Sequence, residues 1–530
     1  MKSTRSKPSA LIGAVVLLFI LSFSGPTAAR ITLQEEVFEF DACTSVIVGK
    51  MASVDGSTMT SHSCDSTTDR TWINVVPRKT YRAGDMCKLY FESKRTKGPD
   101  DPDRLDIGEI PQVQETYAFI NTAYPVMNEH QLAIGETTFG GKRELKSDEG
   151  LIDCPELYRL LLERAKTARE AIQIADRLTK EYGYIDYGEC FTFADPDEVW
   201  HFEILGPGKG KKGAVWAAVR IPDDQVGVSA NASRIRRIDI QDPERYMASD
   251  NVFTLAQEMG WWSPDSGEPF EFCYAYASRR SMGSRRREWR VLSRLAPARN
   301  LDPNGENFPF SVKPEKKLSV QDVLEIFRDT YQDTDFDMTR TLTSRSRKGE
   351  VIKSPVASPF LNREWLELLK VPRERTICCA RATYLHVTQS RGWLPDPIGG
   401  VVWLGYDNPA TTPHTPFYCG ISQMPASYMV DGRWGFRRDC AWWAFRRVSQ
   451  LALLRWQAMT RDIALVWREI ESQAFDDQDR IEQEAQQLYR QNPDKAQAFL
   501  TEYCRKLAEG AVEAYWKLGD ELWGRYTNFF

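Results

Sequence analysis

The segment CTSVIVGKMASVDGSTMTSHSCD, residues Cys43–Asp65, decides the fold. The apolar triplet Val46–Val48 predicts a short buried strand, and Asp55-Gly56 is a strong signal for a hairpin turn. Residues 57–63 can then return as the partner strand. Because this turn reverses the chain, we expect Asp65 to lie beside Cys43, within a few residues of register.

The composition is that of a large globular protein. Of the 530 residues, 42% are hydrophobic and 27% are charged, which is neither a disordered nor a fibrous composition. The formal net charge of −5 gives the chain no basic field that would gather nucleic acid. We therefore expect an enzyme-sized protein without a nucleic-acid partner.

The first residues predict a signal peptide over 1–29. Three basic residues precede the apolar run Ala10–Phe23, and the small residues of 26–29 provide a cleavage site. The run is short for a membrane span, and no second run of spanning length follows. We expect export with no stable membrane anchor after cleavage, and an uncleaved anchor is the alternative. Extracellular, periplasmic and lysosomal destinations are all compatible with this prediction.

The chain after the signal peptide divides into three predicted parts. The acidic stretch 30–42 is typical of a short propeptide, 43–436 is the predicted catalytic domain, and 437–530 is a helical region packed on it. Phe40-Asp41-Ala42 is a poor lipobox, which disfavours a lipid-modified Cys43.

Other predicted elements follow from capping, alternation and turn signals. Asp153 is the expected N-cap of one helix that continues to Gly183. Strands are expected over 198–205, 214–221 and 226–230, with the glycine-rich loop 206–213 as an exposed hairpin connection. That loop matches no phosphate-binding or dinucleotide-binding motif. The region after Cys440 is expected to be helical, with a break at Asn492-Pro493.

Cysteine and histidine usage disfavours a metal site. Eleven cysteines leave at least one thiol unpaired, and their spacing does not determine any disulfide. There is no CxxC or HExxH motif, and the five His residues are scattered. We expect neither a metal nor another cofactor.

Cys43 would be a nucleophile if it became the first residue of the mature protein. A free α-amino group titrates at about 7.7–8.0 and a thiol at about 8.5, so the amine is a suitable base for the adjacent sulfur. This arrangement needs no His. On position alone, however, a buried or disulfide-bonded cysteine is the better explanation of Cys43.

The Cys43–Asp65 segment resembles the start of the peptidase family C69 dipeptidases, a branch of the N-terminal nucleophile hydrolases. The resemblance continues in several ordered blocks as far as about Trp456. These blocks are MNEHQLAIGETTFGG, LIDCPELYRLLLERAKTAREAI, VSANASRIRRID, SRRREWR, QSRGWLPDPIGGVVWLG and CAWWAFRRVSQLALLRW. The resemblance implies an α+β fold, the four-layer αββα sandwich of that superfamily, with a C-terminal helical extension.

The resemblance also implies roles for individual residues. Cys43 matches the nucleophile, freed by cleavage after Ala42, and Asp65 matches the acid that holds its α-amino group. Asn128 and Asn231 match the asparagines that position substrate and stabilise the oxyanion. Arg285 falls where related acylases place an arginine near the thiolate, where a cation lowers the thiol pKa.

Two features of these blocks depart from the simple pattern. The related enzymes carry Arg where this chain has His62, which can still contact a carboxylate or substrate as a pH-sensitive partner. Asn231-Ala232-Ser233 is also an N-glycosylation sequon. The basic run 279–290 is compatible either with a solvated face or with binding of a peptide carboxylate.

The predicted function is hydrolysis of small peptides, above all dipeptides, through a Cys43 acyl-thioester. One alternative is a related amidase acting on other linear amides such as N-acyl amino acids. The other is a secreted binding protein without catalysis. A homo-oligomer is compatible with the sequence.

Overall fold

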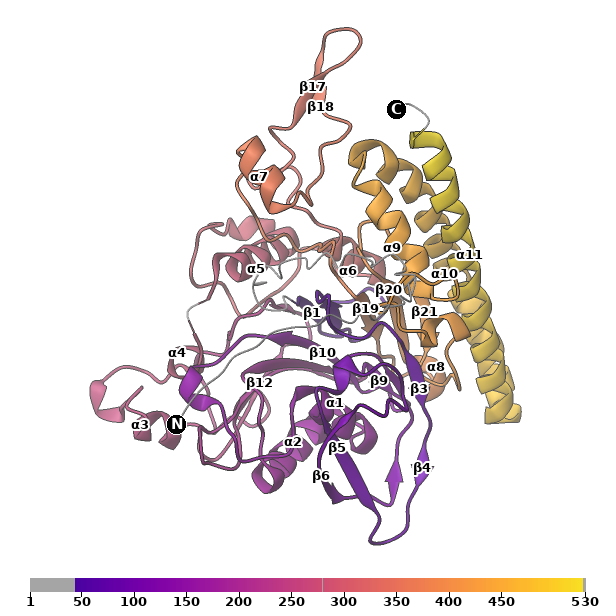
Figure 1. Cartoon of the computed structure of the whole chain (residues 1–530). Helices are drawn as coiled ribbons and strands as arrows, with labels where there is room; N and C mark the ends of the chain where they lie inside the picture. The colour runs from indigo at the N-terminus through magenta and orange to yellow at the C-terminus, as the bar shows by residue number, and fades with distance from the viewer. Residues whose placement is uncertain (1–42, 279, 528–530) are drawn as a thin grey trace, which may run out of the picture. The chain divides into compact units, whose positions relative to one another are not determined.

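The computed structural model describes residues 43–278 and 280–527, and Asp41–Phe530 forms one compact unit. The predicted signal peptide and propeptide lie outside the described residues. Figure 1 shows sheets at the centre of this unit and long C-terminal helices along one side.

The predicted hairpin at the start of this unit is confirmed. Strand β1 (Ser45–Val48) is bridged in antiparallel fashion to the segment that ends in β2 (Ser61–Cys64), through Thr44 with Ser63 and Val48 with Met59. The turn between them uses Gly56, whose φ of +89° lies in the left-handed region. Beyond these bridges, β1 and β2 belong to two different sheets.

The largest sheet has eight antiparallel strands, and it includes the two strands predicted over 198–205 and 214–221. In spatial order the eight strands are β15 (Tyr246–Ala248), β13 (Val215–Ile221), β12 (Val199–Leu205), β11 (Glu189–Ala194), β10 (Ala133–Thr138), β9 (Met127–Asn128), β8 (Phe119–Asn121) and β3 (Asn74–Val76). Val199 pairs with Ile221 and Leu205 with Val215, so the glycine-rich loop closes a hairpin as expected.

Two smaller sheets contain the strands of the N-terminal hairpin. One has the order β1, β14 (Val226–Ser229) and β16 (Ser311–Val312). The other has the order β2, β19 (Tyr384–Gln389), β20 (Val401–Tyr406) and β21 (Thr415–Tyr418). Residues from both ends of the chain thus meet beside β2.

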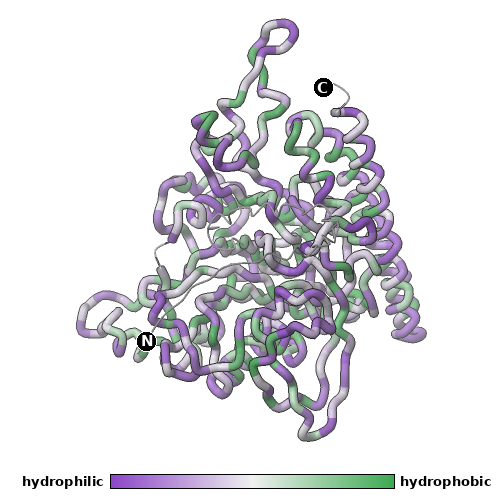
Figure 2. The backbone as a smooth tube through the Cα atoms, viewed as in Figure 1, coloured by the Kyte–Doolittle hydropathy of each residue, from purple (hydrophilic) through white to green (hydrophobic). Residues whose placement is uncertain are grey.

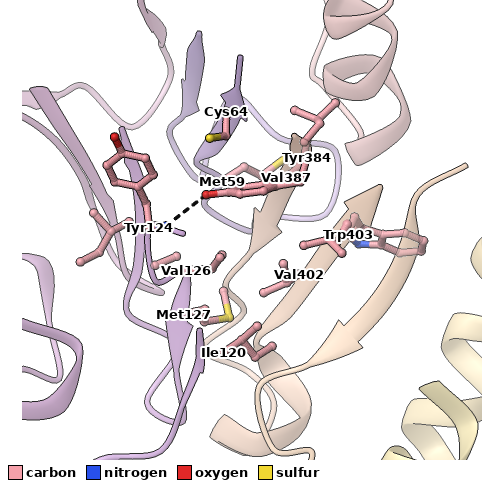
Figure 3. Packing of buried hydrophobic residues seen from close by; sticks show 14 of the residues in the cluster. Met59, Cys64, Ile120, Tyr124, Val126, Met127, Tyr384, Val387, Val402 and Trp403 are labelled. Atoms are coloured by element: carbon pink, nitrogen blue, oxygen red, sulfur yellow. Dashed lines mark hydrogen bonds between the residues drawn. The ribbon is translucent and has the colours of Figure 1, made fainter. Parts of the chain in front are cut away.

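The hairpin packs closely against the eight-stranded sheet. The Thr192 hydroxyl on β11 lies 2.8 Å from the Ser45 hydroxyl and 2.6 Å from the Thr60 hydroxyl. A Cβ at Gly135 would lie 2.3 Å from the Ser61 carbonyl oxygen, so only glycine fits at this crossing. Apolar side chains fill the neighbouring space, where Val126 and Met127 approach Val402 in Figure 3.

The helix predicted from Asp153 to Gly183 is two helices, α1 (Cys154–Arg164) and α2 (Ala168–Tyr182). Asp153 and Gly183 cap the outer ends as expected. The chain is extended at Ala165, and Thr167 then caps α2 by accepting a hydrogen bond from the Glu170 amide. Thr167 and Glu170 are spaced as in a capping box, which is the signal that the continuous apolar periodicity obscured.

Three helices form the C-terminal region: α9 (Ala441–Ala452), α10 (Trp456–Gln491) and α11 (Pro493–Thr527). The break at Asn492-Pro493 is confirmed, because Pro493 cannot donate the backbone hydrogen bond that would continue α10. These helices contact one another, and they contact strands β20 and β21. Figure 2 shows hydrophilic positions recurring along α10 and α11 between hydrophobic ones, as in helices with one buried face.

The remaining elements are short. The additional helices are α3 (Thr254–Glu258), α4 (Phe272–Tyr276), α5 (Met282–Leu295), α6 (Val320–Phe327), α7 (Arg363–Leu369) and α8 (Asp396–Gly399). Two-stranded ribbons pair β4 (Lys79–Thr80) with β7 (Glu115–Thr116), β5 (Met86–Phe91) with β6 (Leu105–Pro111), and β17 (Thr343–Arg345) with β18 (Val351–Lys353). Among residues 43–278 and 280–527, no helix combines the length and apolar character needed to cross a bilayer.

The observed architecture confirms a mixed helix-and-sheet protein with a helical C-terminal region. Helices α1 and α2 contact the eight-stranded sheet, while α5 contacts β14 and α6 contacts β19. The predicted boundary at 436 falls between η5 (Ala426–Met429) and α9. The division into a catalytic domain and a separate helical region stays a prediction.

Candidate active site

The N-terminal hairpin brings Cys43 and Asp65 to one end of the same ribbon. Cys43 directly precedes the bridge between Thr44 and Ser63, and Asp65 follows that bridge on the returning chain. The Ser63 amide donates to the Thr44 carbonyl oxygen at 3.0 Å. The juxtaposition predicted from the hairpin is therefore present, and both residues are buried.

A buried arginine from α5 holds the backbone of Cys43. Nη1 of Arg287 donates to the Cys43 carbonyl oxygen at 2.5 Å and to the Thr44 hydroxyl at 2.8 Å. Burial, followed by repulsion from Arg375, lowers the pKa of Arg287 to about 10. Arg287 thus remains a cation at neutral pH, directly beside the candidate nucleophile.

The Cys43 thiol is 2% exposed. Burial is the main reason that its pKa lies well above the usual value, and the negative charge of Glu136 raises it further. The backbone amide of Asp65 acts in the opposite direction. In the full-length chain, the sulfur is therefore a protonated thiol at neutral pH.

Arg287 links Asn231 to Cys43, because its guanidinium group donates hydrogen bonds to both residues. Nη2 of Arg287 donates to Oδ1 of Asn231 at 2.9 Å, and Nδ2 of Asn231 donates to the Thr138 carbonyl oxygen at 2.7 Å. The backbone of Asn231 has φ of +56°, in the left-handed region that Asn tolerates better than most residues. Such a conformation is often retained at functional sites because it aims a side chain.

The cation that pairs with Asp65 is Arg375, from the segment before β19. Nη2 of Arg375 donates to Oδ2 of Asp65, which also accepts from the Ser63 hydroxyl at 3.3 Å. Burial raises the pKa of Asp65 above its ordinary value, although the neighbouring guanidinium of Arg375 opposes this rise. The hydroxyl of Tyr331 donates to the Arg375 carbonyl oxygen at 2.6 Å and helps to fix this segment.

His62 contacts a different carboxylate. Its Nε2 lies 3.3 Å from Oε2 of Glu136, and both side chains are completely buried. Burial favours a neutral Glu136, but the contacts with His62, the hydrogen bond with Glu189 and the charge of Lys94 together lower the Glu136 pKa to about 2. The adjacent Glu189 behaves oppositely, because burial and the Glu136 charge raise its pKa well above normal. His62 thus contacts the ionised carboxylate of Glu136, which in turn lies next to the protonated carboxyl group of Glu189.

Asn128 is occupied by local structure. Its Nδ2 donates to the carbonyl oxygens of Leu162 at 2.9 Å and Ala165 at 2.7 Å, at the end of α1. Its Oδ1 accepts from the amides of His130 and Leu132. Both amide hydrogens are therefore used to join a turn to a helix end, which leaves none for an oxyanion in this arrangement.

Arg285 lies on another face of α5 from Arg287, because two residues along a helix are separated by about 200°. Its Nη1 donates to the carbonyl oxygens of Asn304 and Gly305, each at 3.1 Å. The structure thus places Arg287, and not Arg285, against Cys43. Arg285 instead lines a cavity of about 240 Å³ together with Arg280 and Ser233.

Within residues 43–278 and 280–527, two groups of side chains have the spacing of metal ligands. Ligand atoms of Cys43, His62 and Glu136 all lie within 4.8 Å of one another, and so do those of Cys154, Asp186 and Glu189. A thiolate, an imidazole and a carboxylate are donors that suit Zn²⁺. Cys43 is a thiol and not a half-cystine in this structure.

Sequence reasoning missed Arg287, Arg375 and Glu136. Arg287 is in the same basic run as Arg285, and the helical phase of that run could have separated the two. Arg375 and Glu136 lie 310 and 74 positions from the residues they contact, Asp65 and His62. No local motif marks either of them.

The buried thiol of Cys43, its hydrogen-bonded backbone and the guanidinium groups of Arg287 and Arg375 lie together at one end of the hairpin. A family model described as peptidase family C69 matches residues 42–469. The chain belongs to peptidase family C69 and is a hydrolase acting on peptide bonds.

Several curated relatives cover most of the chain. A "Probable dipeptidase" of Latilactobacillus sakei is 25% identical over 407 residues, which are 74% of this chain and 76% of the relative. A "Probable dipeptidase" of Salmonella dublin is 28% identical over 72% of this chain and 81% of its own length. "Probable dipeptidase B" of Lactococcus lactis subsp. lactis is 26% identical over 90% and 94%.

Proposed function

We propose that this protein is a secreted cysteine dipeptidase whose nucleophile is Cys43, exposed as the N-terminal residue by cleavage after Ala42. The observation that carries the proposal is the position of Cys43 at the end of the β1–β2 hairpin, between Asp65 and Arg287. The family match begins at residue 42, one position before Cys43. The names of the relatives support dipeptides as substrates.

In this mechanism the new α-amino group accepts the thiol proton, and the thiolate attacks the scissile carbonyl. Asp65 is the anion that holds the resulting ammonium group, and Arg375 keeps Asp65 in place. Asn231 is the better candidate for oxyanion stabilisation than Asn128, since it shares Arg287 with Cys43. The ammonium then protonates the leaving amine, and water hydrolyses the acyl-thioester to regenerate Cys43.

Substrate binding is assigned to the cavity lined by Arg285 and Arg280 together with Glu306. The two cations at this position can bind the free carboxylate of a dipeptide. The role of Arg285 thus shifts from the thiolate to the substrate.

The proposed fold is the four-layer αββα sandwich of the N-terminal nucleophile hydrolases. The order of contacts supports it, since helices α1 and α2, the eight-stranded sheet, the two smaller sheets and helices α5 and α6 follow one another. Secretion is proposed from the N-terminal segment alone.

The test is the N-terminus of the active protein together with the variant Cys43→Ala. We expect intact mass to place the N-terminus at Cys43, and Cys43→Ala to abolish dipeptide hydrolysis while the fold survives. Cys504→Ala is the matched control, because it removes a buried thiol from α11 and is expected to remain active. Activity in Cys43→Ala, or in protein that begins at Arg30, would contradict the proposal. Blocked and free dipeptides compared side by side distinguish a dipeptidase from an amidase for N-acyl amino acids.

A further inference from the structure

The projecting lobe, residues 340–373, extends away from the sheets of the unit. It contains the β17–β18 ribbon and helix α7, and Figure 1 shows the ribbon reaching beyond α7. The base of the lobe is held by a small apolar cluster that is separate from the main core. This cluster consists of Met338, Leu342, Leu361, Leu366 and Val371. The lobe is therefore attached through its inner side, and its outer side is in contact with solvent.

Helix α7 carries apolar side chains on both its inner and its outer side. On the inner side, Leu366 is buried in the cluster. Trp365, Leu368 and Leu369 are instead 52%, 70% and 44% exposed. Residues three and four positions apart lie on the same side of a helix, so these three side chains form one stripe. A surface helix normally turns such a stripe toward the core, and an apolar group left in solvent indicates a contact surface.

The β17–β18 ribbon adds further exposed apolar side chains. Every residue of β18 is exposed, and Val351 is 67% exposed. Ile352 and Val356 are also large apolar residues on the surface. The ribbon is a two-stranded sheet of its own, and such a ribbon is only marginally stable in water when it is isolated. A partner that covers these side chains would stabilise it.

The projecting lobe is basic, although the chain as a whole is acidic. Residues 340–373 include eight Lys and Arg and three Glu, a net charge of +5, whereas the full chain has a net charge of −5. Arg345, Arg347 and Lys348 are grouped at the turn of the ribbon, with Glu350 as an acidic neighbour, and all four are exposed. The charge of the lobe is therefore complementary to an anionic partner.

We propose that the projecting lobe binds the surface of an anionic lipid bilayer. The stripe of α7 enters the headgroup region, and the cations at the ribbon turn contact the lipid phosphates. Exposed Trp and Leu next to clustered Lys and Arg are typical of segments that lie in a membrane interface. A protein partner would need apolar pockets and acidic groups in matching positions, whereas a bilayer with anionic lipids offers both over its whole surface. This inference goes beyond the proposed dipeptidase activity and does not depend on it.

The projecting lobe leads directly to the candidate active site. Just after the lobe, Glu374 pairs with Arg286 of α5 and Arg375 pairs with Asp65. A bound lobe would therefore hold the candidate site next to the bilayer. Because a short stripe and a few cations take part, we expect the attachment to be reversible.

The test is flotation of the purified protein with phosphatidylcholine vesicles that contain either no anionic lipid or phosphatidylserine as about a third of the lipid. We expect binding to the anionic vesicles, weaker binding at high salt, and little binding to the neutral ones. Each Lys or Arg near an anionic surface strengthens partitioning about fivefold, so Arg345→Gln/Arg347→Gln/Lys348→Gln should weaken it about 100-fold. Leu368→Ser should weaken it about tenfold, because an apolar side chain no longer leaves water.

Two matched variants on the C-terminal helices are the controls. Leu465→Ser changes a side chain of α10 that is 69% exposed, nearly the same as Leu368. Arg480→Gln/Lys506→Gln/Lys517→Gln removes three exposed cations from α10 and α11. Both controls should bind anionic vesicles as the wild type does. All four variants should keep the urea unfolding midpoint of the wild type, since every changed side chain is exposed.

Three results would overturn the inference. The first is no binding to anionic vesicles, or equal weakening in the lobe variants and in their controls. The second is a dimer in sedimentation that Leu368→Ser dissociates, because the stripe of α7 would then be a subunit interface. The third is vesicle binding that polyglutamate displaces and Leu368→Ser does not weaken, which would identify an acidic protein as the partner.

Discussion

The pairing of Asp65 with Arg375 makes a quantitative prediction about stability. Asp65 is completely buried and the Arg375 side chain is 22% exposed, so solvent screens this ion pair little. Replacing Arg375 with Met keeps most of the side-chain volume but leaves the carboxylate without its partner. Removing one partner of a buried pair typically costs about 3–5 kcal/mol. Because Arg287 also acts on Asp65, we expect a loss near the lower end, about 3 kcal/mol.

The sign of the pH dependence follows from the Asp65 pKa, which the fold raises above the ordinary value of 3.8. A carboxyl group with a raised pKa in the fold destabilises the protein as pH rises above its unfolded pKa. Arg375→Met removes the main opposing charge and raises that pKa further. The stability deficit of Arg375→Met should therefore be larger at pH 7 than at pH 4, where Asp65 is protonated more easily.

Urea unfolding at both pH values measures this effect. Asp65→Asn and the double variant Asp65→Asn/Arg375→Met complete a double-mutant cycle. In the double variant, the unpaired charge of Asp65 is removed as well. We expect the double variant to recover most of the lost stability at pH 7. Arg363→Met removes an exposed i,i+4 pair with Glu367 and should change stability by no more than about 1 kcal/mol. A loss in Arg375→Met no greater than in Arg363→Met, or equal at both pH values, would refute the assignment of Arg375 as the partner of Asp65.

Two further predictions concern the site itself. Zn²⁺ should inhibit the mature enzyme, and EDTA should restore its activity. The reason is that the Cys43 thiolate and α-amino group, with His62 and Glu136, offer sulfur and nitrogen ligands within reach of one ion. Equally strong inhibition by Mg²⁺ would contradict this, since Mg²⁺ prefers oxygen ligands. Asn231→Gly, which tolerates the left-handed backbone, should lower kcat by about 10²–10³-fold. Asn128→Ala should instead destabilise the fold by about 2 kcal/mol or more in urea unfolding, because four hydrogen bonds are lost. Equal effects of Asn231→Gly and Asn128→Ala on kcat would refute the assignment of a catalytic role to Asn231 and a structural role to Asn128.

Local signals in the sequence predicted what depends on neighbouring residues. The Asp55-Gly56 turn was enough to place Asp65 beside Cys43, and the strand alternation was enough to pair 199–205 with 215–221. The break between α1 and α2 was missed because the apolar spacing continues through it, although Thr167 carries a capping signal. Helical periodicity reports a buried face, and two helices in line can share one face.

Contacts across long stretches of chain could not be predicted in this way. Glu136 meets His62 because the eight-stranded sheet packs on β2, and Arg375 meets Asp65 because the segment before β19 ends next to β2. Both meetings depend on how sheets stack, which no single segment specifies. Asn128 is the converse case, since the sequence block in which it lies predicted a role in catalysis but its amide is committed to the end of α1.

The charge of Arg375 also explains how His62 can occupy a position where the related dipeptidases carry Arg. An arginine there would serve the anion that follows on the same strand, but in this chain Arg375 already neutralises Asp65 from another part of the fold. The side chain at 62 is therefore released from pairing with Asp65 and turns to Glu136 on the facing sheet.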